Sequence, residues 1–153
     1  MISLDIHFKE SLHQFCLNLT REKVKRLSNL LESILHDLNT ATKSSAGDKH
    51  ETARAMIHIE QENHAKQLLE AQKTLKLLSQ IKTKAMSSGQ TGALIQTNKG
   101  IFYIATGLGK VKFDESDVFV ISPSSPIGQK FLNSKINDII QFNAHQYEIE
   151  QIA

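Results

Sequence analysis

The chain has 153 residues and a formal net charge of only +2, so its overall charge neither requires nor excludes a nucleic-acid partner. Hydrophobic residues make up 40% of it, which is enough to bury a core and excludes a fully disordered chain. The single cysteine, Cys16, excludes an intramolecular disulfide framework, and no apolar run approaches the roughly 18 residues of a membrane span. With no signal peptide at the N-terminus, these features predict a soluble, cytoplasmic protein.

The two halves of the chain differ in composition. Residues 1–84 contain 13 Lys and Arg against 10 Asp and Glu, a formal 13 − 10 = +3, whereas residues 85–153 contain 5 against 6, or −1. Two of the nine aromatic residues lie in the first half, while both prolines and six of the seven glycines lie in the second. Because glycine and proline punctuate strands and turns but interrupt helices, we expect an α+β chain that is helical first and β-rich second.

Residues 1–86 are predicted to form a long antiparallel helical hairpin, a coiled coil with its tip near residues 43–51. Apolar side chains recur at helical spacing over roughly residues 8–42 and again over residues 57–78. Each stripe is too narrow to enclose a core alone, so we expect the two helices to bury each other. An arm of about 35 residues is on the order of 50 Å long. The stripes comprise Leu12, Phe15, Leu19, Val24, Leu27, Leu30, Leu31, Ile34, Leu35 and Leu38, then Ile57, His64, Leu68, Ala71, Leu75 and Leu78.

Residues 92–153 are predicted to form a small antiparallel β domain with one short helix, joined to the hairpin by a linker at residues 87–91. Ser125 is the expected N-cap of that helix, Pro126 its first residue, and Leu132 its end. Alternating apolar residues separated by turn residues mark five strands. They are expected at residues 93–97, 101–106, 118–121, 139–142 and 146–152.

Two stretches resemble the Gre family, the bacterial transcript-cleavage factors GreA and GreB that enter the secondary channel of RNA polymerase. Residues 118–132, followed by Asp138, are similar to the family's strand, Ser-Pro turn and short helix. Residues 47–51 resemble the Gly-Asp-x-x-Glu tip of its coiled coil. Asn133 and Asn137 stand where glycines are common, and asparagine tolerates the left-handed backbone that such turns need. The resemblance covers nearly the whole chain and implies a β domain like that of FK506-binding proteins.

The resemblance implies that Asp48 and Glu51 reach the active centre of RNA polymerase and help to hold a Mg²⁺ ion there, so that the polymerase cleaves its own backtracked RNA. Carboxylates suit Mg²⁺, and two side chains three residues apart on a helix face the same side. The protein itself would have no active site or cofactor, would meet the RNA 3′ end only indirectly, and would need no small-molecule substrate. Ser124, Ser125 and Pro126 match the turn near the family's polymerase contact.

Other interpretations stay open. Asp48-x-x-Glu51 is also a capping box, and the family's second tip acid and tyrosine are replaced here by Arg54 and Ala55. A channel-binding regulator that inhibits the polymerase without stimulating cleavage therefore also fits. A prolyl isomerase would need an apolar pocket lined by aromatic rings. The chain contains no Trp, which counts against this alternative. A coiled-coil interaction protein unrelated to transcription would need only the hairpin.

Several remaining residues are expected to be structural. His58 and His64 lie six residues apart and face different sides of a helix, so they do not form a metal site, and His64 is expected to pack in the hairpin seam. Cys16 is expected to be a small buried hydrophobe. The basic residues at 21, 23, 25 and 26 are expected to be solvated, or else to line a path toward RNA. The segment 107–110 is a glycine turn without the spacing of a phosphate-binding loop.

Overall fold

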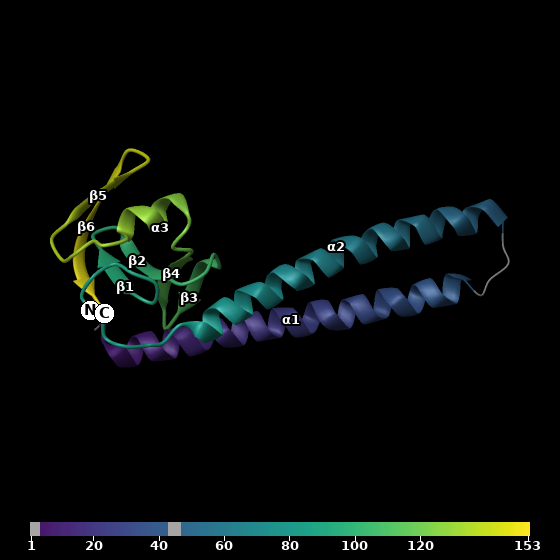
Figure 1. Ribbon diagram of the computed structural model, residues 1–153, viewed down its shortest axis with the longest axis horizontal. Helices are drawn as coiled ribbons and strands as arrows, with labels where there is room; N and C mark the ends of the chain where they lie inside the picture. The colour runs from purple at the N-terminus through teal and green to yellow at the C-terminus, as the bar shows by residue number, and fades with distance from the viewer. Residues whose placement is uncertain (1–3, 43–46) are drawn as a thin grey trace. The chain divides into compact units, whose positions relative to one another are not determined.

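The computed structural model describes residues 4–42 and 47–153, with side chains described for residues 4–40 and 51–153. The chain forms two compact units, one of Asn18–Leu75 and one of Met1–Leu17 with Lys76–Ala153. No helix in the described stretches is long and apolar enough to cross a membrane. In chain order the elements are α1 (Ile6–Thr42), α2 (Gly47–Gln80), β1 (Leu94–Thr97), β2 (Gly100–Ile104), β3 (Gly109–Phe113), β4 (Ser116–Ile121), α3 (Pro126–Phe131), β5 (Ile139–Phe142) and β6 (His145–Ile152) (Figure 1).

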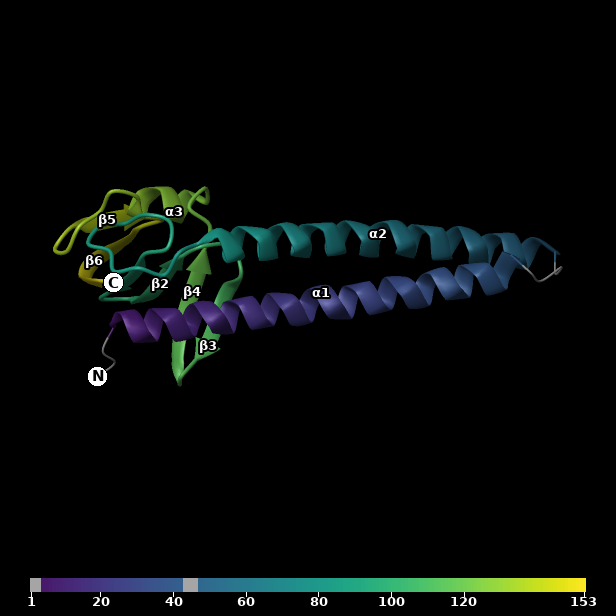
Figure 2. The same ribbon diagram turned by 60° about the horizontal axis from the view of Figure 1, so that its bottom comes forward.

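In the unit Asn18–Leu75, α1 and α2 run side by side in opposite directions (Figures 1 and 2). Leu27 and Ile34 on α1 and Ala71 on α2 are buried, so the two predicted stripes do cover each other. Leu30 and Leu35 are each 40% exposed although they belong to the predicted stripe. Two helices share only one seam, so side chains that flank its central row stay in contact with solvent. The predicted helical hairpin is confirmed.

The other unit contains a six-stranded sheet in the order β3-β4-β2-β1-β6-β5. It is mixed: β2 and β4 pair in parallel, whereas the other neighbouring strands pair antiparallel. The predicted β domain with one short helix is confirmed, but the expectation of a purely antiparallel sheet is wrong at the β2–β4 pair. The extra strand β3 accounts for the difference, because it reverses the chain and lets β4 return alongside β2 in the same direction.

Strand β3 was not predicted, since its sequence begins with glycine and alternates lysines with only two apolar residues. Val111 and Phe113 are half-buried, whereas Lys110 and Lys112 are exposed on the sheet edge. The Phe113 ring lies 5.4 Å from that of Phe8, and a second α1 ring, Phe15, lies 5.2 Å from it. Residues 109–113 resemble a charged turn in sequence. They form a strand because Phe113 packs against aromatic rings of α1.

The sheet has a core on each face because strand residues alternate between faces. On one face, Phe102 and Ile104 of β2 pack with Ile95, Ile149 and the α3 residue Phe131. Tyr103 lies between Phe102 and Ile104 in β2 and therefore points to the opposite face of the sheet. It is fully buried there, and its hydroxyl forms a hydrogen bond with His13 of α1. This alternation places β2 at the centre of the unit, with α3 over one face and the start of α1 against the other.

Two asparagines occupy left-handed turns, as the sequence predicted. Asn133 has φ 65° and Asn137 has φ 75°. For Asn137→Ala we expect the free energy of unfolding to fall by about 0.5–1.5 kcal/mol, because alanine lacks the short polar side chain that can bond locally to the backbone in this conformation, whereas Asn137→Gly should stay within about 0.5 kcal/mol of wild type. Urea denaturation measures both. Equal stability of the alanine and glycine variants would contradict a conformational role for this residue.

Candidate functional site

The predicted tip lies at the start of α2, and only part of it is described. The side chain of Asp48 lies outside the described residues, as does the segment 43–46. Glu51 is exposed near the N-terminal end of α2, where the helix dipole favours a negative charge. Across the described residues, no group of three or more His, Cys, Asp or Glu side chains is arranged to hold a metal ion. The Glu51 carboxylate is the kind of hard oxygen ligand that Mg²⁺ prefers.

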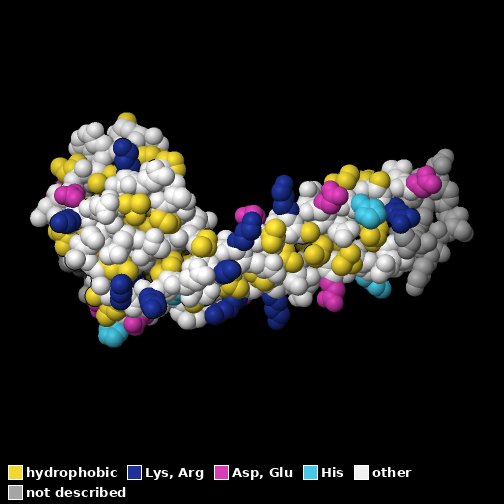
Figure 3. Space-filling view, in the orientation of Figure 1, with side chains coloured by type: hydrophobic (Ala, Val, Ile, Leu, Met, Phe, Trp, Pro, Cys, Tyr) yellow, Lys and Arg dark blue, Asp and Glu magenta, His cyan; other side chains and the backbone are white. Residues whose placement is uncertain are grey.

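The helical unit carries its basic residues on the surface. All four members of the predicted cluster are exposed, at Arg21, Lys23, Lys25 and Arg26. Arg21 donates a hydrogen bond of 3.4 Å to Oδ1 of Asn18 in its own helix turn. Figure 3 shows Lys and Arg side chains interspersed with hydrophobic ones along the helices. Solvated charge is thus confirmed, while a path toward RNA stays a prediction.

The Ser-Pro turn before α3 is held by its own hydrogen bonds. Oγ of Ser125 accepts from the Gly128 amide at 3.1 Å and donates to the Ser122 carbonyl at 2.6 Å. Ser125 is the N-cap, and Pro126 follows it at the start of the helix, as predicted. A β-carbon on Gly128 would lie 2.0 Å from the Ser122 carbonyl oxygen, so the turn requires glycine there. Ser124 and Pro126 are exposed.

A pocket of about 390 Å³ opens on the sheet face that α3 partly covers. Its rings come from three strands: Phe102 lies 5.3 Å from Phe119 and 5.6 Å from Tyr147, measured between ring centroids. The lining consists of Lys99, Phe102, Phe119, Ile121, Ile127, His145 and Tyr147. An apolar pocket lined by aromatic rings is what the isomerase alternative requires, and this one forms without Trp. Sequence reasoning missed it because the three strands are far apart in the chain.

A group of buried polar side chains joins the first turns of α1 to the sheet and to the segment that follows α2. Lys9 is fully buried, its Nζ donates to the Lys84 carbonyl at 2.5 Å, and burial lowers its pKa to about 8. A hydrogen bond of 2.7 Å links Nδ1 of His13 with the hydroxyl of Tyr103, and burial lowers the pKa of His13. Burial also raises the pKa of Cys16 to about 11 and that of Tyr103, the latter further through Cys16. Residues 9, 13 and 16 share a helical face, which is the sequence pattern that could have revealed this group.

Two solved structures are similar to this chain. GreA factor homolog 1 (Gfh1) of Thermus thermophilus is 16% identical, with a TM-score of 0.34, over 85% of this chain and 94% of that protein. A second structure, of the transcription factor Gfh1, is 14% identical, with a TM-score of 0.34, over 88% of this chain and 89% of that one. No protein-family model and no curated protein sequence matches the chain.

The residues singled out by the Gre resemblance fall in both units. Glu51 belongs to the unit Asn18–Leu75, and the Ser-Pro turn belongs to the other unit. Among the residues expected to be structural, His64 is half-buried in the seam and its Nδ1 lies 2.8 Å from the Glu60 carbonyl oxygen. Cys16 is buried, as predicted. The described structure therefore leaves the tip acid and the Ser-Pro turn as the exposed candidates among the Gre-like motifs.

Proposed function

We propose that this chain is a Gre-like transcription elongation factor that binds RNA polymerase in the cytoplasm through the secondary channel and stimulates cleavage of backtracked RNA. One observation carries the proposal: an exposed carboxylate, Glu51, stands near the start of a long helix that pairs with a second one. Helix α1 has 37 residues, about 55 Å at 1.5 Å per residue. A narrow arm of this kind suits a channel that a globular domain cannot enter.

In this proposal, Asp48 and Glu51 contribute carboxylate oxygens to a Mg²⁺ ion shared with the polymerase. That ion supplies the activation of a water and the stabilisation of charge on the leaving oxygen. The chain's own task is positioning. Helix pairing through buried residues such as Leu27 and Ile34 holds the two helices together, and a spacing of three residues would put the two acids on one helical face. The catalytic centre itself belongs to the polymerase, so the factor is not an independent enzyme.

A second candidate is a regulator that occupies the same channel and inhibits the polymerase. The observation that favours it is Arg54, which is exposed three residues after Glu51 and therefore brings positive charge to the same helical face. A cation there competes with Mg²⁺ for the Glu51 carboxylate. In this function the Ser-Pro turn, Ser124 to Pro126, still contacts the polymerase.

Two assays test these functions. Purified RNA polymerase is first passed over the immobilised full chain, and retention at moderate salt is expected for both. Stalled, backtracked complexes are then incubated with the chain and Mg²⁺, and release of short 3′ RNA is measured. Release supports the cleavage factor, and binding with suppressed elongation but no release supports the inhibitor. Failure to retain the polymerase overturns both and leaves the hairpin as an interaction module of another kind.

A further inference from the structure

The aromatic pocket of the β domain has chemistry that the transcription proposal does not use. It is open: Phe119, Ile121, Ile127 and Tyr147 are only half-buried, and Phe102 alone is buried at its base. Its apolar surface therefore stays accessible to a side chain that enters from solvent. Burying one large aliphatic or aromatic side chain is typically worth a tenfold or greater gain in affinity.

One edge of this pocket is positively charged. Nζ of Lys99 lies 5.8 Å from the centroid of the Tyr147 ring and 3.4 Å from Nδ1 of His145. Both basic side chains are exposed, and the pocket lining contains no carboxylate. Among the described residues, no acidic side chain lies within ion-pair distance of Lys99. The edge thus lacks a counter-charge, which an incoming carboxylate would supply.

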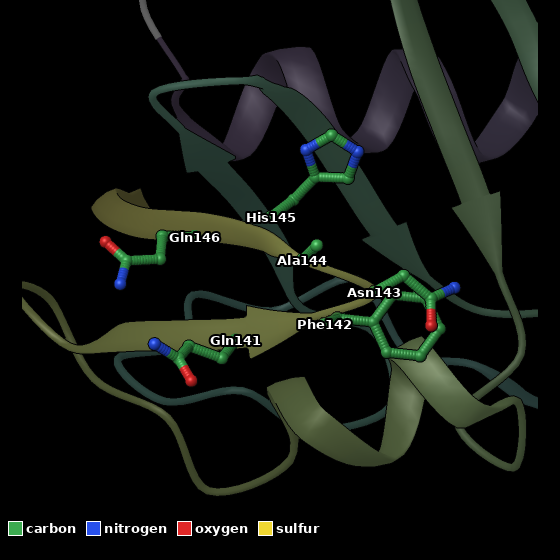
Figure 4. A pocket seen from close by; sticks show the side chains of 6 residues that line it. All are labelled: Gln141, Phe142, Asn143, Ala144, His145 and Gln146. Carbon is green, nitrogen blue, oxygen red and sulfur yellow. The ribbon is translucent and has the colours of Figure 1, made fainter.

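A second depression, of about 380 Å³, adjoins the first and shares His145 with it. It is formed by the β5–β6 turn, and its lining comprises Gln141, Phe142, Asn143, Ala144, His145 and Gln146. Figure 4 shows these side chains radiating from the turn instead of converging on one point. Dispersed amides of this kind do not hold a single compact ligand, but they can meet successive polar groups along a peptide backbone.

The arrangement of the rings argues against a nucleotide as the occupant. Phe102 and Phe119 stack on each other at an interplanar angle of 25°, and Tyr147 meets Phe102 edge-on at 89°. Their π-faces are therefore partly used within the protein, whereas a base needs a free face on which to stack. The aliphatic side chains Ile121 and Ile127 complete a pocket better shaped for a branched apolar side chain.

We infer that this pocket is a docking site for an acidic peptide segment of a protein partner, which inserts one large apolar side chain between β4, β6 and α3 and places a neighbouring carboxylate on Lys99 and His145. The inference does not depend on the transcription proposal, because the occupant is defined by the pocket alone. Peptide binding can fail while polymerase is retained, and the reverse, so the two are separately testable.

The test uses a fluorescein-labelled, blocked peptide of sequence Gly-Asp-Leu-Glu-Gly-Ser and the full-length chain, with binding followed by fluorescence anisotropy. Replacing the peptide's leucine by alanine should weaken binding at least about tenfold. Replacing its two acids by amides should weaken binding about two- to fivefold and remove the salt dependence. Thermal melts of each protein variant establish that it is folded.

Two protein variants locate the site. Lys99→Gln should reproduce the loss seen with the amide peptide, and its matched control, Lys112→Gln on the exposed edge of β3, should bind as wild type does. Ile127→Ser should weaken binding about tenfold through lost apolar contact. No binding of the acidic peptide at 1 mM, equal binding of its amide version, or displacement by adenosine monophosphate at lower concentration would each overturn the inference.

Discussion

Glu51→Gln is expected to reduce stimulated RNA cleavage by about a hundredfold, the usual size of removing one preorganised stabilising group from an active centre. The substitution removes the charge that attracts Mg²⁺ but keeps the length of the side chain. A glutamine at this position also preserves a capping box, since glutamate and glutamine serve equally well there. The melting temperature should therefore stay within about 2 °C of wild type. Gel analysis of 3′ RNA fragments from backtracked complexes measures the effect.

Glu62→Gln is the matched control, because Glu62 is also exposed on α2 but lies three turns further along the helix. We expect it to leave cleavage unchanged within about twofold. Asp48→Asn should resemble Glu51→Gln if both acids address the same ion. A loss of stability in Glu51→Gln without a loss of cleavage would instead assign this residue to the helix cap alone, and the cleavage function would then have no chemical basis at the tip.

Lys9→Met is expected to stabilise the protein at neutral pH by about 1–3 kcal/mol. The folded-state pKa of Lys9 is about 8, against 10.5 for an ordinary lysine, so the buried ammonium opposes folding. A shift of about 2.5 pKa units corresponds to roughly 3 kcal/mol at pH values where both states are protonated. Methionine matches the apolar stem and removes the charge, but leaves the Lys84 carbonyl without its donor, which reduces the gain. Urea denaturation measures the difference.

The stabilisation expected for Lys9→Met should depend on pH. Because the folded-state pKa of Lys9 is lowered, the folded protein binds fewer protons than the unfolded one between about pH 8 and 10.5, and the stability of the wild type gains from this group as pH rises. The advantage of Lys9→Met should therefore be largest below pH 8 and shrink above it. Cys16 and Tyr103 have raised pKa values and cost stability above about pH 9, but this loss is common to both proteins and cancels.

An exposed lysine provides the control for Lys9. Lys112→Met, on the edge of β3, should change the free energy of unfolding by less than about 0.5 kcal/mol. If Lys9→Met is less stable than wild type at every pH, the hydrogen bond to the Lys84 carbonyl outweighs the cost of burial. Lys9 would then stabilise the packing of α1 against the segment that follows α2.

Local patterns sufficed for much of this molecule. The apolar stripe predicted a helix over roughly residues 8–42, and α1 runs from Ile6 to Thr42. Ser125 and Pro126 marked the start of α3 because a cap and a fixed φ act within a few residues. Asn133 and Asn137 marked left-handed turns for the same local reason. Each of these features depends on neighbours in the chain, so a single sequence contains the information needed to predict it.

Other features depend on contacts between distant residues, and only the tertiary structure decided them. Strand β3 exists because Phe113 packs on rings of α1, although its lysines suggested a turn. Lys9 is buried because the sheet and the segment after α2 cover that face of α1; helical spacing places Lys9 on the same face as His13 and Cys16 but does not show what covers it. The pocket needs Phe102, Phe119 and Tyr147 from three strands. The sequence by itself thus determined the helical hairpin, the β-rich second half and the Gre-like motifs, because these follow from spacing along the chain. The parallel strand pair, the buried charge and the pocket arose from three-dimensional packing, because the residues that create them are far apart in sequence.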